Sequence, residues 1–290
     1  MCIRFFNNLS NVYDRYEIKP QNVYNVNETC ITTVQVPTKI VAKKGKKQVG
    51  AITSSERRTL VTCCVAVKAT GNSIPPFLIF PRQKFHDHFI RDGPPGCIGA
   101  ANGSGWMQAA EFWLLLHHFV KHAKPSKDNV VPSLPDNHDS HLYIPSIEFC
   151  QDNGIILLSL PTHCSHCLQP LDVSVYGPLK RYVNVAMNSW IKNHPGIRMT
   201  IYNIPEITRT TLPFALTPSN IASGLQKTGI WPFNRNIFQE SDFAPSSVTD
   251  VPQSSLGGQS LDILVPDFTQ TSPPQASLNE PALEIPPSFF

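Results

Sequence analysis

The sequence predicts an α/β protein in which a mixed β-sheet is flanked by helices. Three β-rich runs follow one another within the first 81 residues. After residue 105, helical and β-rich segments alternate, which is typical of a partly parallel sheet. The hydrophobic fraction is 41%, an ordinary value, so a chain of 290 residues can bury a sizeable core in one large or two smaller domains.

The first part of the chain predicts an antiparallel meander. Residues 4–20 hold a helical pattern, and the β-branched and aromatic residues of 23–29 suit a short strand. Residues 60–67 form a nearly continuous apolar run, as expected of a central strand. A third strand is expected over 76–81, with proline at both ends, and the Gly- and Pro-rich stretch 93–105 is expected to be a loop.

The second part predicts alternating helices and strands. Apolar residues at three- and four-residue spacing predict a helix over 109–122. The next segments are a strand over 130–134, a helix over 144–153, a strand over 154–161, and helices over 172–193, 205–214 and 218–228. The order β-β-β-α-β-α-β-α is the wiring of an RNase H-like domain.

Charge is distributed unevenly between the body of the chain and its end. Residues 241–290 carry six acids and no Lys or Arg, and they are rich in Pro and Ser. We therefore expect a folded domain over 1–236 and a disordered acidic tail over 237–290. The first 240 residues hold all 24 basic residues and 15 acids, a net formal charge of +9. This charge suits a polyanionic partner, although a merely basic, solvated surface explains it equally well.

No secretion signal or membrane span is expected. The N-terminal residues lack an apolar core of the needed length, and the longest apolar runs, such as 60–67, are far shorter than the roughly 20 residues of a membrane helix. Eight cysteines without a secretion signal are expected to be reduced thiols in the cytosol or nucleus.

A basic cluster lies between the first two predicted strands. Such a run is often solvated surface, but it also suits contacts with phosphate groups or a nuclear import signal. We assign it as a candidate nucleic-acid-binding surface. Its members are Lys43, Lys44, Lys46, Lys47, Arg57 and Arg58.

Two acids occupy positions where a metal site is expected. Asp136 follows the predicted strand over 130–134, and Asp172 begins a predicted helix 36 positions later. Open α/β sheets place their sites at the carboxyl ends of strands. Paired carboxylates there hold Mg²⁺ or Mn²⁺ in nucleases and phosphoryl transferases. Helix capping also explains such acids, so their positions alone do not decide between the two.

Several motifs, spread over about residues 5–236, point to one family. They are 23–29, 46–50 followed by 53–57, 105–107, 136–141, 163–172 and 229–234. Together, in this order, they resemble the DDE-type endonuclease domain of pogo/Tigger/jerky-like transposases, of the Tc1/mariner superfamily. The resemblance implies an RNase H-like fold and metal-dependent DNA strand cleavage and transfer with Mg²⁺ or Mn²⁺. It also implies DNA as a partner, a nuclear location and a homodimer.

The resemblance assigns catalysis and metal binding to Asp136 and Asp172, but its first acid falls on Asn27. Asparagine offers one neutral carbonyl oxygen in place of two charged ones. We therefore expect impaired catalysis, because losing one such group costs a few kcal/mol. The neighbouring Glu28 should point to the other face of the strand, and only a local bulge would let it substitute.

Further departures support this expectation. Pro132 and Pro135 interrupt the strand before Asp136 and should shorten it, because proline lacks a backbone donor. These transposases usually carry a helix-turn-helix region before the catalytic domain. Since the motifs begin near the start of this chain, we do not expect specific recognition of transposon ends.

The stretch 163–167 has the spacing of half a zinc site. Cys164 and Cys167 are interleaved with His163 and His166, but no matching second pair is evident in the sequence. We consider zinc unfavoured and expect the two histidines to orient the loop of the site.

Three functions stay open from the sequence. The favoured one is a transposon-derived domain that binds DNA without cleaving it. A working Mg²⁺-dependent endonuclease is the first alternative. A host interaction protein or decaying remnant with neither activity is the second.

Overall fold

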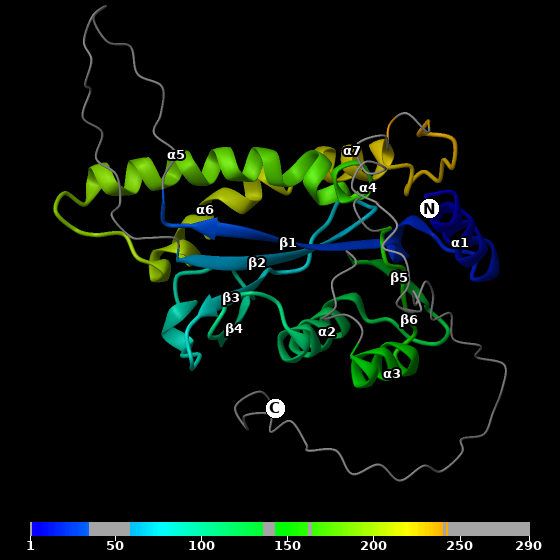
Figure 1. Cartoon of the computed structure of the whole chain (residues 1–290), viewed down its shortest axis with the longest axis horizontal. Coiled ribbons are helices and arrows are strands. Elements are labelled where there is room, and N and C mark those ends of the chain that lie inside the picture. Colours follow the sequence, from blue (N-terminus) through cyan, green and yellow to red (C-terminus); the bar gives the residue numbers. More distant parts are fainter. Residues whose placement is uncertain (1, 35–58, 136–142, 162–163, 240–241, 243–290) are drawn as a thin grey trace, which may run out of the picture.

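A mixed β-sheet of order β4-β3-β2-β1-β5-β6 lies at the centre of the computed structural model (Figure 1). The structure describes residues 2–34, 59–135, 143–161, 164–239 and 242. In these residues the strands are β1 (Tyr24–Thr32), β2 (Leu60–Lys68), β3 (Phe77–Pro81), β4 (Ile98–Asn102), β5 (Val131–Leu134) and β6 (Ile155–Leu157).

The pairing of the strands confirms the predicted meander and mixed sheet. β2 is antiparallel to both β1 and β3, whereas β1 pairs with β5, and β5 with β6, in parallel. β1 lies at the centre of the sheet, as the first strand of the meander and the parallel neighbour of β5, and this is the arrangement of an RNase H-like sheet. The predicted fold class is therefore confirmed.

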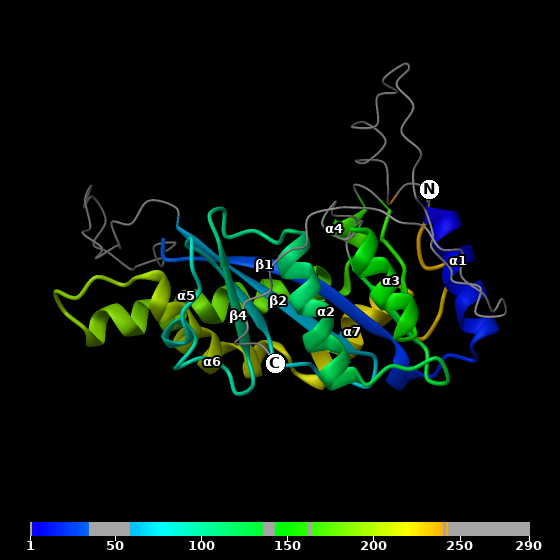
Figure 2. The ribbon, with the colours of Figure 1, turned by 90° about the horizontal axis from the view of Figure 1, so that it is seen from below.

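Helices cover both faces of this sheet (Figures 1 and 2). One face carries α2 (Ala109–Ala123) and α3 (Ile144–Asp152). The other carries α1 (Cys2–Arg15), α5 (Gly177–Asn193), α6 (Ile204–Ala215) and α7 (Pro218–Lys227). The short segments are α4 (Ser165–Leu168), the π-helix η4 (Asp172–Tyr176), and the 3₁₀ turns η1 (Pro20–Asn22), η2 (Asp87–Phe89) and η5 (Ile201–Asn203).

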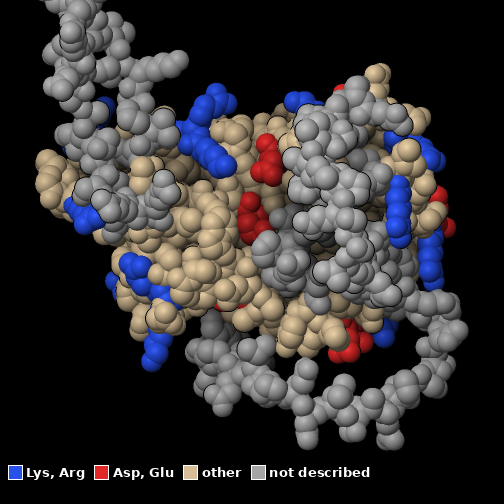
Figure 3. Space-filling view, viewed as in Figure 1, with Lys and Arg blue, Asp and Glu red and all other residues tan. Residues whose placement is uncertain are grey.

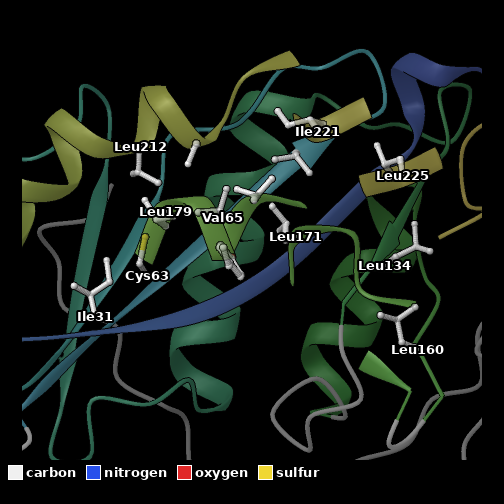
Figure 4. Packing of buried hydrophobic residues seen from close by; sticks show 14 of the residues in the cluster. Ile31, Cys63, Val65, Leu134, Leu160, Leu171, Leu179, Leu212, Ile221 and Leu225 are labelled. Carbon is white, nitrogen blue, oxygen red and sulfur yellow. The ribbon is translucent and has the colours of Figure 1, made fainter. Parts of the chain in front are cut away.

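Strand β2 shows why its apolar run is continuous. Cys63 and Val65 pack into the cluster under α5 and α6, and Figure 4 shows Leu179 and Leu212 beside them. Cys64, between them in the sequence, belongs to the cluster on the α2 side. Because successive side chains of a strand point to opposite faces, a sheet covered on both faces favours apolar residues at nearly every position of such a strand.

Strand β4 corrects the prediction of a loop over 93–105. Ile98–Asn102 pairs in parallel with β3 at the edge of the sheet. Its small residues give a weak strand signal, and the structure explains one of them. A Cβ atom on Gly99 would lie 2.4 Å from Cε2 of Phe85, so the ring packs where a side chain would otherwise be.

Pro132 lies within β5 and Pro135 directly follows it, and the strand has four residues, which is short as predicted. The Val131 N–H donates to the Gly154 carbonyl at 2.9 Å, and the Leu158 N–H donates to the Ser133 carbonyl at 3.0 Å. Because backbone groups alternate in direction, the nitrogen of Pro132 faces β1 rather than β6. On that side the first β1 partner is Tyr24, opposite Ser133, so no ladder bond is lost at Pro132.

Residues 229–239 join the end of the described body to α1. Tyr13 donates its hydroxyl proton to the Ile230 carbonyl at 3.1 Å, and its ring packs edge-on against Trp231 at 5.9 Å.

Seven cysteines of the described residues are free thiols. No helix in the described ranges is long and apolar enough to cross a membrane. Apart from residues 237–239 and 242, the expected tail lies outside the described residues.

Candidate active site

Asn27 and Asp172, 145 residues apart in the sequence, meet in the structure. The Asn27 Nδ2 atom donates a hydrogen bond to Asp172 Oδ2 at 3.2 Å. Asn27 lies in the middle of β1 and is 5% exposed, while Asp172 is exposed at the start of η4. The sheet and η4 thus bring together the first and third positions of the predicted triad. Asp136, the second position, lies outside the described residues.

The π-helix η4 presents Asp172 and continues directly into α5. Single π turns inside helices are frequent at functional sites. Helix α7 packs closely against η4 at Gly224. A Cβ atom on Gly224 would lie only 2.4 Å from Ser174 Oγ and 2.6 Å from the Pro170 carbonyl oxygen, so the two segments are in direct contact there. This close approach of α7 limits how far the segment carrying Asp172 can shift.

Tyr176 holds the backbone of Asn27 in place. Its hydroxyl group donates to the Asn27 carbonyl oxygen inside the core. Burial raises the pKa of the Tyr176 phenol well above its ordinary value, so the group stays a protonated donor at neutral pH. Asn27 is therefore fixed twice, through its side chain by Asp172 and through its carbonyl group by Tyr176.

A buried amide network lies behind Asn27 on the same face of β1. Asn25 is fully buried and donates from Nδ2 to the Leu134 carbonyl at 2.8 Å and to Gln169 Oε1. Its Oδ1 accepts the Leu171 N–H at 3.3 Å. Sequence reasoning missed Asn25, Gln169 and Tyr176. The available signal was Asn25 itself, a polar residue between the apolar residues Tyr24 and Val26 of β1.

Glu28 lies on the opposite face of β1, as predicted. Its Oε1 is 3.9 Å from the thiol of Cys64, a residue of the cluster on the α2 side. Glu28 therefore does not take the place of the missing acid beside Asp172.

The described residues do not by themselves fit a two-ion site. They contribute the carboxylate of Asp172 and the amide of Asn27, whose nitrogen faces that carboxylate. Mg²⁺ requires oxygen ligands, and paired ions require several carboxylates. Within the described ranges, no group of three or more His, Cys, Asp or Glu residues could hold a metal ion.

The predicted cysteine and histidine stretch shows no shared ligand geometry in its described part. Cys164 is buried before α4, and the Cys167 thiol lies 3.8 Å from the Asp242 carbonyl oxygen. His166 is exposed, and His163 lies outside the described residues.

The predicted basic cluster of Lys43, Lys44, Lys46, Lys47, Arg57 and Arg58 lies outside the described residues. In the described part, Figure 3 shows acidic side chains near the middle of one face, with Lys and Arg side chains on both sides of them. A groove of about 200 Å³ between β1 and α5 begins two residues after Asn27, at Thr29, and Lys180 lines it. Cationic side chains thus border the face that displays the acids.

Comparison with known proteins supports what this geometry indicates. The family model of the DDE superfamily endonucleases matches residues 55–212, more than half of the chain. The chain belongs to the DDE superfamily of endonucleases. Asp136 and Asp172 fall inside the matched range of this DDE domain, whereas Asn27 precedes it.

Individual relatives of this DDE domain are distant. The MFS-type transporter clz9 of Cochliobolus lunatus is 28% identical over 227 residues, which are 77% of this chain and 24% of that protein. The chain therefore spans about a quarter of that relative's length.

Solved structures similar to the chain include those of the Mos1 transposase. The Mos1 strand transfer complex is 16% identical, covers 78% of this chain and 57% of its own, and has a TM-score of 0.49. The Mos1 mariner paired-end complex with Mn is 14% identical, with coverages of 78% and 59% and the same TM-score of 0.49.

Proposed function

We propose that this chain is a DDE domain of the pogo/Tigger/jerky-like kind that binds DNA and is impaired in strand cleavage. The observation that carries this proposal is the hydrogen bond from Asn27 Nδ2 to Asp172 Oδ2. It joins two of the three positions at which the resemblance places carboxylates. An amide donor at this position satisfies the Asp172 carboxylate without a bound cation.

The electrostatic consequence has two parts. Asn27 removes one negative charge from the site, and its N–H group occupies a lone pair of Asp172 that would otherwise face a cation. Both effects lower the attraction of the site for Mg²⁺ or Mn²⁺. Loss of one electrostatic catalytic group typically lowers a rate roughly 100- to 1,000-fold, which is the impairment we expect here.

The proposed DNA partner is supported by charge and by family. Residues 1–240 carry a net formal charge of +9, and DDE superfamily domains are endonucleases. We assign phosphate contacts to the basic cluster defined above, with little dependence on base sequence because such contacts read the backbone. A nuclear location and a homodimer belong to the same proposal.

A plasmid-nicking assay with Mg²⁺ or Mn²⁺ tests the impairment. We expect Asn27→Asp to nick the plasmid at least about 100-fold faster than the native chain. The same substitution at the exposed turn residue Asn72 is the matched control and should gain nothing. Nicking by the native chain that is as fast as that of Asn27→Asp and disappears in Asp136→Ala would overturn the proposal in favour of a working endonuclease.

The salt dependence of duplex DNA binding tests the partner. The logarithm of the association constant should fall linearly with the logarithm of salt concentration, by about 0.9 for each phosphate neutralised. Replacing Lys43, Lys44 and Lys46 by Ala should make this slope shallower. A control triple at Lys121, Lys124 and Lys127, which are exposed on and after α2, should leave it unchanged. Absence of binding even at low salt would indicate a remnant or a host interaction protein without DNA activity.

A further inference from the structure

We propose that Asn25 is a positioning residue that fixes the three triad-bearing segments relative to one another. This inference rests on the proposed function for the meaning of the triad, but its contacts stand on their own. Asn25 lies in β1 two residues before Asn27, on the same face of the strand. Its side chain bonds to the two other segments, and each bond falls close to a triad position.

The three contacts reach far along the sequence. Nδ2 of Asn25 donates to the carbonyl of Leu134, two residues before Asp136, at 2.8 Å. Oδ1 of Asn25 accepts the N–H of Leu171, the residue before Asp172, at 3.3 Å. The second Nδ2 proton goes to Gln169 Oε1, in the segment that leads to Leu171.

Asparagine is the side chain that meets this pattern of donors and acceptors. The Leu134 carbonyl and Gln169 Oε1 both need a donor, while the Leu171 N–H needs an acceptor. A primary amide offers two donors and an acceptor on one plane, whereas aspartate offers no donor and leucine offers neither. Glutamine is one methylene longer, and the site is fully buried, so it does not fit without displacement.

Because the hydrogen-bond network of Asn25 is buried, it strongly constrains the positions of the segments that it joins. Asn25, Leu134, Gln169 and Leu171 are all fully buried. In the described part of the chain, Gln169 Nε2 has no hydrogen-bond partner. The side-chain amide of Gln169 is therefore held through its oxygen, which accepts a hydrogen bond from Asn25 Nδ2. Buried polar groups depend strongly on their few partners, because water cannot replace a lost bond. Movement of Leu171 away from Asn25 therefore leaves unpaired groups on both segments.

The side-chain amide of Asn27 reports this positioning in the native chain. If Asn25 holds Asp172 against Asn27, then Asn25→Ala should weaken the bond from Asn27 Nδ2 to Asp172. In NMR spectra of the full chain, the Asn27 amide protons, assigned by their loss in Asn27→Ala, should exchange with water about tenfold faster or more. Gln169→Met removes one of the three contacts and should produce a smaller change of the same kind.

Asn22→Ala is the matched control. Asn22 is also buried and donates from Nδ2 to Asn129 Oδ1 and to the Val130 carbonyl, at the opposite end of β5. It should lower global stability without altering the Asn27 amide protons. The proposal is overturned if both Asn25→Ala and Gln169→Met leave those protons as they are in the native chain. It is also overturned if Asn22→Ala changes them as much as Asn25→Ala does.

A second readout separates this proposal from the proposed function. In the Asn27→Asp background, adding Asn25→Ala should weaken Mn²⁺ binding, measured by calorimetry, about 10- to 100-fold, the usual effect of removing a group that orients metal ligands. If Asn27→Asp binds no Mn²⁺ at all, the proposal that these positions form a remnant metal site is contradicted. The Asn27 amide measurement then still decides whether Asn25 positions Asp172. Unchanged Mn²⁺ affinity after Asn25→Ala would argue against the positioning role.

Discussion

The substitution Asn27→Asp should replace the hydrogen bond between Asn27 and Asp172 by a pair of carboxylates that repel each other. The stability of the folded domain should then depend on a bound divalent cation. In the native chain, Asn27 Nδ2 lies 3.2 Å from Asp172 Oδ2. A carboxylate oxygen at the position of Nδ2 would repel Asp172 by about 5 kcal/mol at an effective dielectric constant of about 20, and by about 1.3 kcal/mol in bulk water. Asn27 is buried and Asp172 is exposed, so we expect an intermediate cost of about 2–4 kcal/mol.

Thermal unfolding in EDTA and in Mg²⁺ or Mn²⁺ measures this effect. For a domain of this size, 1 kcal/mol corresponds to about 2–4 °C, so Asn27→Asp should melt about 5–15 °C below the native chain in EDTA. A cation at 100 times its dissociation constant should restore about 2.7 kcal/mol. The native chain should show no comparable shift, and neither should Asn72→Asp.

Two results would refute this reasoning. One is an Asn27→Asp variant as stable as the native chain in EDTA, which would mean that the two side chains do not face each other. The other is an equal cation-dependent shift in Asn72→Asp, which would mean that the cation acts elsewhere on the molecule.

Three further predictions concern the surroundings of the site and two buried thiols elsewhere in the core. Tyr176→Phe removes the donor to the Asn27 carbonyl and should lower the free energy of unfolding, measured in urea, by about 1–2 kcal/mol. Tyr182→Phe, on the exposed side of α5, is the control and should be neutral, and equal effects would contradict a role for the Tyr176 bond. Gly224→Ala should cost about 1–3 kcal/mol because its methyl group would meet Ser174 and Pro170, while Gly177→Ala, with open space around it, should be tolerated, as calorimetry can show. Burial raises the pKa of the Cys63 and Cys150 thiols from 9.0 to about 12, so the folded state holds protons that the unfolded state releases. The contribution of these two thiols to stability should therefore be constant below pH 9 and fall as pH rises from 9 to 12. Cys63→Val should make that fall shallower in urea unfolding measured at each pH.

Hydropathy patterns predicted the central strands and most helices because burial on one or both faces determines their residue types. β2 is buried on both faces and has a nearly continuous apolar run, and α5 begins after Asp172 as its spacing predicts. β4 escaped prediction for a packing reason. Gly99 leaves room for the Phe85 ring, and no local pattern in 93–105 reveals that an aromatic side chain elsewhere in the sequence needs this space.

The site was predictable in part. Family motifs predicted that positions 27 and 172 belong to one site, and the structure brings their side chains into hydrogen-bond contact; their role in a site stays a prediction. The alternation of strand residues placed Glu28 on the far face. The supporting network was not predictable, because each contact of Asn25 joins residues more than 100 positions apart. A polar residue in a strand shows that a partner is needed, but only the fold shows which backbone groups provide it.

The network also explains how the fold tolerates Asn27. Converging carboxylates repel one another when no cation is present, so an acid at position 27 would make the folded state depend on metal. The amide of Asn27 removes this dependence by donating to Asp172, while Asn25 and Tyr176 still hold both segments where they are. Loss of the acid is therefore compatible with, and even favourable for, stability of the metal-free domain. The positioning contacts can persist because they stabilise the core itself, whether or not the DNA-cleaving chemistry survives.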